Sequence, residues 1–261
     1  MAALRSALFL AWMVLTVIPW GTAMVLWSIV QRGTPLYWGC VGWLSSAMWG
    51  MKRIAGVHWR VTGMEHLPTA ADGQAAVLLA CKHQSTLETF LLPTIMSHPL
   101  AYVFKRELLY VPFFGWAMGR MDMIHIDRRK RTEAWNKVAE QGRRLFAQGT
   151  WVIMFPEGTR TERGDKGVYK SGASRLAIAA GVPIVPIAVN SGKFWPRKSF
   201  LLRPGVVDVV IGPPIPSAGR QPEELMQQVE AWIEAEMRRI DPEAYATSGQ
   251  ATGSMPGAGR S

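Results

Sequence analysis

The run AAVLLACKHQSTLETF, residues 75–90, begins with seven apolar or small residues and turns polar at Lys82. A short apolar run with polar residues after it predicts a strand buried on both faces. His83 then falls just past the carboxyl end of this strand, where α/β proteins commonly place reactive groups. The segment therefore predicts an α/β fold with a candidate functional residue at His83.

Further apolar runs along the chain support the same fold class. The predicted strands cover residues 75–81, 101–104, 123–126, 151–155, 182–189 and 206–211. Between and after them, residues 132–148 and 222–240 place apolar side chains at helical spacing, and Gly149 suits a helix C-cap. Strands that alternate with amphipathic helices indicate an α/β sheet.

The N-terminus has a different composition. Residues 7–30 carry no charge and are long enough, as a helix, to cross a hydrocarbon layer of about 30 Å. Pro19 and Gly21 interrupt this stretch, so a kinked span and a re-entrant turn both remain open. A cleaved signal peptide is the alternative interpretation, but the apolar stretch continues past the candidate cleavage site.

A second uncharged stretch, residues 34–51, contains three tryptophans among glycine and serine. Tryptophan favours the headgroup level of a membrane. We therefore predict a two-helix anchor over residues 1–53, partly embedded and partly interfacial, with Lys52 and Arg53 on the cytoplasmic side.

The formal net charge of +10 favours an anionic partner, which could be nucleic acid, an anionic membrane or a phosphorylated substrate. Lys52, Arg53 and Arg60 directly follow the apolar N-terminus, and this placement favours a membrane surface. The chain has only two cysteines and five scattered histidines, so neither a disulfide framework nor a metal site is predicted.

His83 and Glu88 allow two interpretations. Glu88 could orient the imidazole, which would then accept a proton from a hydroxyl as a general base. Alternatively, Ser85 and Glu88 form a capping box in which the carboxylate satisfies a free backbone N–H. Both functions can coexist in one side chain.

Two further segments place charges directly after predicted strands. FPEGTR, residues 155–160, offers a glycine turn between Glu157 and Arg160, and FKREL, residues 104–108, contains Lys105 and Arg106. Each segment alone is compatible with an ordinary turn and solvated charges. Together with His83, these groups would converge at one edge of a sheet.

In this combination the sequence resembles the glycerophospholipid acyltransferase family. The family motifs are H-x-x-x-x-D, a short basic segment, F-P-E-G-T-R and a proline-bracketed strand, and they match in order over residues 58–215. The resemblance implies a central mixed sheet flanked by helices as an acyltransferase domain over residues 54–243. Residues 244–261 lack apolar periodicity and are predicted to form a disordered tail. One departure is Glu88, which stands where the family has aspartate.

The resemblance also implies residue roles. His83 would deprotonate the acceptor hydroxyl, and Glu88 would orient His83. No acyl-enzyme would form. The implied substrate-binding residues are Lys105, Arg106 and Arg160 for a phosphate, Glu157 for the glycerol portion, Gly158 for a close backbone approach, and Thr159.

The expected reaction moves an acyl group from acyl-CoA or acyl carrier protein to the sn-2 hydroxyl of 1-acyl-sn-glycerol-3-phosphate (lysophosphatidic acid), giving phosphatidic acid. No cofactor or metal and no nucleic acid partner is expected. The expected location is a bacterial-type inner membrane, with the catalytic domain on the cytoplasmic face. Alternatives are transfer to another lysolipid or to glycerol-3-phosphate, and a non-catalytic basic protein that binds membrane or RNA. A serine esterase is disfavoured because the chain has no G-x-S-x-G motif.

Overall fold

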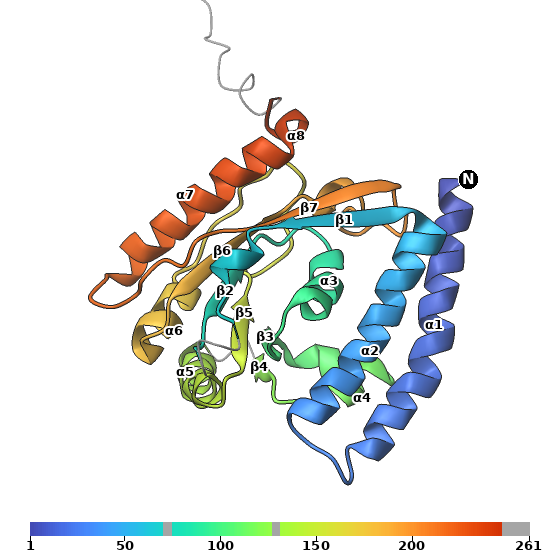
Figure 1. Cartoon of the computed structure of the whole chain (residues 1–261), viewed down its shortest axis with the longest axis horizontal. Coiled ribbons are helices and arrows are strands. Elements are labelled where there is room, and N and C mark those ends of the chain that lie inside the picture. The colour runs from blue at the N-terminus through green and yellow to red at the C-terminus, as the bar shows by residue number, and fades with distance from the viewer. Residues whose placement is uncertain (70–74, 127–130, 247–261) are drawn as a thin grey trace, which may run out of the picture.

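The computed structural model describes residues 1–69, 75–126 and 131–246. A seven-stranded sheet lies between two groups of helices (Figure 1). The strands are β1 (Val57–Thr62), β2 (Leu78–Cys81), β3 (Leu100–Lys105), β4 (Ile124–Ile126), β5 (Trp151–Met154), β6 (Ile184–Val189) and β7 (Gly205–Ile211). The α-helices are α1 (Ala2–Trp27), α2 (Thr34–Gly50), α3 (Leu87–Ile95), α4 (Phe114–Met118), α5 (Arg131–Ala147), α6 (Gly172–Ala180), α7 (Pro222–Ile240) and α8 (Pro242–Ala246). Short helical turns are η1 (Met51–Ala55), η2 (Met64–His66), η4 (Arg106–Tyr110) and η5 (Ser191–Lys193).

The strand order is β1-β7-β6-β2-β5-β3-β4. Neighbouring strands are parallel except β6 and β7, which pair antiparallel. The sheet is therefore mixed, and the predicted fold class is confirmed. The sequence analysis missed β1, an edge strand whose burial alternates along VHWRVT, because only every second residue is apolar.

Alternate residues of the strands enter two separate cores. Leu79 and Cys81 of β2 face the core that contains α1, α2 and α3, whereas Leu78 and Ala80 face the core that contains α5, α6 and α7. Figure 1 shows these two helix groups on opposite sides of the sheet. Helix α7 has the predicted bounds and buries Leu225 with its helical neighbours on one face.

The predicted anchor forms two helices that differ in character. Among the described helices, α1 is the one long and apolar enough to cross a membrane. It continues through Pro19 and Gly21, so this helix contains no re-entrant turn there. The shorter α2 packs against α3 and buries seven of its residues, so it belongs partly to the domain core.

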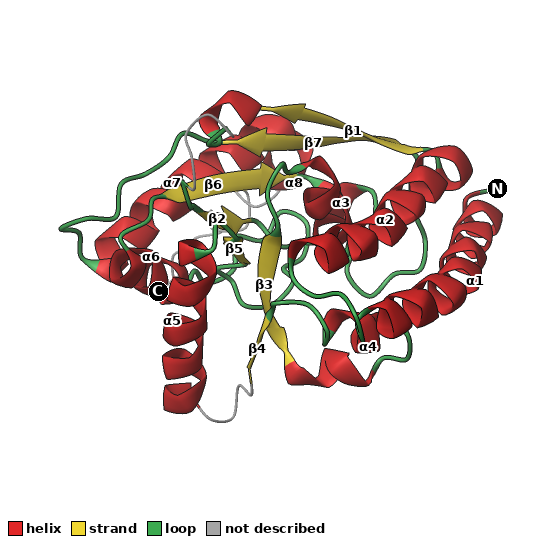
Figure 2. Cartoon of the chain, turned by 60° about the horizontal axis from the view of Figure 1, so that its bottom comes forward, coloured by secondary structure: helices red, strands yellow, loops and turns green. Residues whose placement is uncertain are grey.

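Both ends of α1 contact the domain. Near its start, the Ser6 hydroxyl accepts the Leu202 N–H at 2.9 Å. Near its end, Gly21 packs so closely on Phe113 that an added Cβ would lie 2.8 Å from the Phe113 Cβ. Helix α1 therefore lies along the side of the domain, beside α2 and α4 (Figure 2).

The predicted boundary between the domain and the tail, after residue 243, falls inside a helix. Residues 242–246 form α8, so the first three residues of the predicted tail are helical. The rest of that tail, residues 247–261, lies outside the described residues.

Candidate active site

Three neighbouring parallel strands end at one edge of the sheet. Strand β2 lies between β5 and β6 and is parallel to both. His83 follows β2, residues 155–161 follow β5, and Ser191 follows β6. Because parallel strands point their carboxyl ends the same way, these segments meet at one place, as the motif positions predicted.

The segment after β5 holds His83 from several directions. The Phe155 ring stacks on the imidazole with ring centroids 3.8 Å apart and an interplanar angle of 15°. The backbone N–H of His83 donates to Glu157 Oε1 at 3.2 Å. The His83 carbonyl accepts the Thr161 N–H at 2.8 Å. The FPEGTR segment thus positions the histidine, and a fixed ring is what general-base catalysis requires.

Glu88 is fully buried beside the turn that carries His83. Its Oε1 accepts the Gln84 N–H at 2.7 Å, the Ser85 N–H at 2.9 Å and the Ser191 hydroxyl at 2.7 Å. Burial raises the pKa of Glu88 to about 7, and these donors act in the opposite direction. The carboxylate therefore depends on its hydrogen bonds to remain charged.

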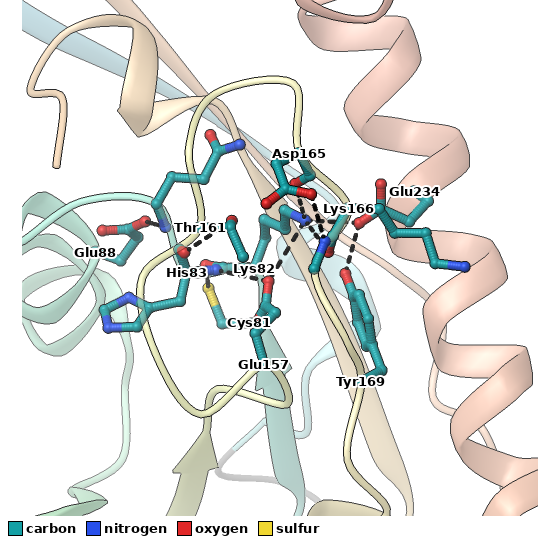
Figure 3. Close-up of polar contacts among 12 residues, drawn as sticks. Cys81, Lys82, His83, Glu88, Glu157, Thr161, Asp165, Lys166, Tyr169 and Glu234 are labelled. Atoms are coloured by element: carbon teal, nitrogen blue, oxygen red, sulfur yellow. Dashed lines mark hydrogen bonds and ion pairs between the residues drawn. The ribbon is translucent and has the colours of Figure 1, made fainter. Parts of the chain in front are cut away.

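Of the two hydrogen bonds that define a capping box, the structure contains one. Glu88 accepts the Ser85 N–H as in a capping box, but the Ser85 hydroxyl accepts the N–H of Leu87 instead of that of Glu88. A carboxylate has about four acceptor positions, so capping leaves room for a second function. In Figure 3 the His83 ring and Glu88 lie on the same side of the β2 end. Orientation of His83 by Glu88 stays a prediction.

Lys82 is a site residue that the sequence analysis missed. Its side chain is fully buried and points away from the His83 ring, towards α7 (Figure 3). The Nζ atom lies 2.7 Å from Glu234 Oε1 and 3.5 Å from Glu157 Oε1. It also donates to the carbonyls of residues 165 and 166, at 3.1 and 2.9 Å. Lys82 thereby ties β2, the segment after β5 and α7 together.

Glu157 connects this lysine to His83. It is 3% exposed, and its Oε1 faces both the His83 N–H and the Lys82 ammonium. Burial raises the pKa of Glu157 to about 7, while the charge of Lys82 lowers it. The described contacts of Glu157 support the backbone of His83, and its predicted contact with a glycerol group stays a prediction.

A cavity of about 440 Å³ opens beside the imidazole. Its lining is largely apolar and comes from α1, α2, α3, β3 and residues 108–123. Polar groups gather where α3 begins, and Arg160 Nη1 donates to Thr86 Oγ1 there at 2.8 Å. His83 and Arg160 therefore share one cavity with a long apolar wall.

The other predicted binding residues lie in different places. Lys105 and Arg106 are exposed at the junction of β3 and η4 and do not line the cavity. Thr159 is also exposed. Gly158 has φ +67°, a conformation that favours glycine, and an added Cβ would lie 3.0 Å from Lys170 Nζ.

In the described part of the chain, no three His, Cys, Asp or Glu side chains are grouped as metal ligands.

Comparison with known proteins decides the family. The sequence model of the acyltransferase family matches residues 58–190. The chain belongs to this acyltransferase family. This match confirms the enzyme prediction at the level of acyl transfer.

Individual relatives agree with this assignment. This acyltransferase is 38% identical over 244 residues to the 1-acyl-sn-glycerol-3-phosphate acyltransferase of Pseudomonas aeruginosa, covering 92% of the chain and 93% of the relative. It is 35% identical to the Escherichia coli protein of the same name over 57% of the chain and 60% of that protein. The crystal structure of PlsC from Thermotoga maritima, a 1-acyl-sn-glycerophosphate acyltransferase, matches with a TM-score of 0.75 at 21% identity. That match covers 92% of this chain and 95% of that one, and it shows the shared fold.

Proposed function

We propose that this acyltransferase moves a fatty acyl group from a thioester donor to the sn-2 hydroxyl of 1-acyl-sn-glycerol-3-phosphate, giving phosphatidic acid. The observation that carries the proposal is the single cavity that joins an apolar wall to His83 and Arg160. An apolar wall suits acyl chains, and a guanidinium suits a phosphate. The names of the relatives agree with this substrate.

The proposed chemistry uses a general base and no acyl-enzyme. An imidazole nitrogen of His83 takes the proton of the acceptor hydroxyl as its oxygen attacks the thioester carbonyl. The new O–C bond forms, the C–S bond breaks, and the proton passes from the imidazolium to the leaving thiolate. The reaction as written balances with acyl-CoA or acyl carrier protein as co-substrate and needs no further cofactor.

Glu88, Lys105 and Arg106 enter the proposal with different support. Glu88 would favour the imidazolium through its negative charge, and its position in the first turn of α3, beside the turn that carries His83, supports this role. Lys105 and Arg106 are exposed at the end of β3, where they would attract the anionic acceptor or donor from solution.

We place the enzyme on the cytoplasmic face of a bacterial-type inner membrane. The outer face of α1 exposes large apolar side chains such as Leu4, Leu15 and Leu26. Lys52 and Arg53 in η1 are exposed directly after the anchor helices, where positive residues favour the cytoplasmic side.

The deciding experiment measures transfer of a labelled acyl group in defined vesicles. Purified enzyme is offered 1-acyl-sn-glycerol-3-phosphate, glycerol-3-phosphate and a lysolipid with a zwitterionic headgroup, each with acyl-CoA and with acyl carrier protein. The proposal expects phosphatidic acid from the first acceptor with the highest kcat/KM. Preference for either of the other acceptors would contradict it, and His83→Ala serves as the inactive control.

A further inference from the structure

The segment of residues 106–118, from η4 to α4, exposes apolar side chains outside the predicted anchor. Tyr110 is 68% exposed, Trp116 is 49% exposed, and Leu108 and Val111 are each 42% exposed. Exposed single apolar residues are ordinary, but a cluster of them on one short segment indicates an interaction surface.

This segment continues the apolar face of α1. Phe113, at its centre, contacts α1 at Gly21, and helix α4 packs beside α1. Figures 1 and 2 both place α4 next to α1, on the side of the sheet away from α7. The large exposed hydrophobic residues of α1 are leucine, valine, isoleucine and tryptophan, and together with the segment they form one apolar surface.

The same segment forms the mouth of the active-site cavity. Leu108 and Val111 line the cavity and are also exposed to the outside. Trp20 of α1 likewise lines the cavity and is partly exposed. Residues of both α1 and the segment therefore lie on the cavity wall and on the apolar surface at once, so the cavity opens between these two elements.

Charges at the rim of this surface favour an anionic lipid over a second protein. Lys105, Arg106 and Arg120 are exposed at the two ends of the segment. The nearby acidic residues are Glu107, and Asp122, which pairs with Arg144. Apolar and aromatic side chains with cations at the edge match the layers of a bilayer leaflet, with acyl chains inside and anionic headgroups outside.

We propose that residues 106–118 insert into the same leaflet as α1 and bring the mouth of the cavity into the lipid. An acyl chain can then pass between the leaflet and the cavity without crossing water, which avoids the free-energy cost of exposing its CH₂ groups. Tyr110 and Trp116 lie at the headgroup level, where amphipathic rings are most stable. The membrane contact of the enzyme thus consists of the anchor and a second element at the cavity mouth.

Site-specific labelling tests this contact directly. The background variant is Cys40→Ala, since the other cysteine, Cys81, is fully buried and shielded from reagents. Single cysteines introduced by Trp116→Cys, Leu15→Cys and Gln227→Cys are labelled with an environment-sensitive nitrobenzoxadiazole dye. Leu15 on α1 is the positive control. Gln227, exposed on α7 across the sheet, is the negative control.

The proposal expects a blue shift and quenching by doxyl-labelled lipid at positions 116 and 15 when vesicles of phosphatidylcholine and phosphatidylglycerol are added. The label at position 227 should keep its aqueous emission. Aqueous emission at 116 with a shifted label at 15 would overturn the proposal. A label at 116 that is already shielded without vesicles would also overturn it, because the surface would then bind another copy of the chain.

A kinetic test uses Tyr110→Ser and Trp116→Ser, which change exposed side chains outside the lining of the cavity. For a long-chain acceptor held in vesicles, KM should rise several-fold while kcat is unchanged. For a short-chain acceptor that dissolves in water, both constants should be unchanged. An equal effect on both acceptors would contradict a lipid contact. This second test rests on the proposed function, whereas the labelling test does not, so the two can fail separately.

Discussion

Glu88→Gln is the substitution that best separates catalysis from capping. In the structure, one carboxylate oxygen accepts the hydrogen bonds from Gln84, Ser85 and Ser191. The other oxygen accepts a second, longer contact from the Ser85 N–H at 3.1 Å. A glutamine can place its carbonyl oxygen at the first position and its amide nitrogen at the second. It therefore keeps the three main hydrogen bonds and loses one shared contact.

The expected loss of stability is small for this reason. Hydrogen bonds to a neutral group contribute less to stability than those to a charged group. However, the glutamine also avoids burying the charge of a carboxyl group whose pKa is raised to about 7. The two effects oppose each other, so the free energy of unfolding at pH 7 should change by about 1 kcal/mol or less. Glu88→Ala should cost more, about 1–3 kcal/mol for each donor left unsatisfied.

The rate should respond very differently. Glutamine removes the charge that favours the imidazolium, so kcat should fall by about 10²-fold or more if Glu88 assists His83. The assay compares kcat at saturating substrates with denaturant unfolding followed by tryptophan fluorescence. Ser191→Ala is the matched control. It removes a donor to Glu88 but keeps the carboxyl group, so it should raise the pKa of Glu88 and shift the pH-rate profile to higher pH.

A folded Glu88→Gln enzyme with a normal rate would refute the assistance and leave capping as the only function of Glu88. A normal rate for His83→Ala as well would refute the proposed mechanism. Glu88→Asp should retain more activity than Glu88→Gln if charge matters more than reach.

Three further predictions follow from the buried charges and the cavity. Lys82→Met should destabilise the fold by about 3–5 kcal/mol, because it leaves Glu234 buried without its cation, whereas Arg220→Ala at an exposed pair should cost about 1 kcal/mol or less in the same denaturant titration. Between about pH 4.5 and 7, Glu88 in the folded state holds a proton that the unfolded state has released, so it should make stability fall as pH rises, by about 1.4 kcal/mol per pH unit. Glu88→Gln should remove that part of the slope in unfolding titrations. Arg160→Ala should lower kcat/KM for a phosphorylated acceptor, by an amount equal to a loss of about 1.5–3 kcal/mol of transition-state stabilisation, and should leave KM for the thioester donor unchanged. Equal losses for both substrates would remove Arg160 from the phosphate site.

Sequence patterns located most elements because their signals are local. The apolar run before Lys82 predicted β2, and the helical spacing of apolar residues predicted α7 with its observed bounds. The positions of His83 and FPEGTR after two strands predicted their meeting, since parallel strands end at the same edge. Strand β1 was missed because an edge strand with one buried face has too few apolar residues to stand out.

The partners of the buried charges had no such signal. Lys82 and Glu234 are 152 residues apart, and nothing near either residue indicates the other. Lys82 stood out only as a charge between a buried strand and a candidate histidine. Ser191, which donates to Glu88, likewise lies in a short turn without a recognisable motif. Such contacts depend on how α7 and β6 pack against β2.

The sequence by itself determined six of the seven strands, the main helices, the apolar N-terminus and the chemistry available at the strand ends. Periodicity, length and residue type act over a few neighbouring residues, so they can be read along the chain. Only the tertiary structure decided that α1 lies along the domain, that Glu157 faces Lys82, and that the cavity opens between α1 and residues 106–118. Burial and charge pairing are properties of surfaces in contact, and those surfaces come from segments far apart in the chain.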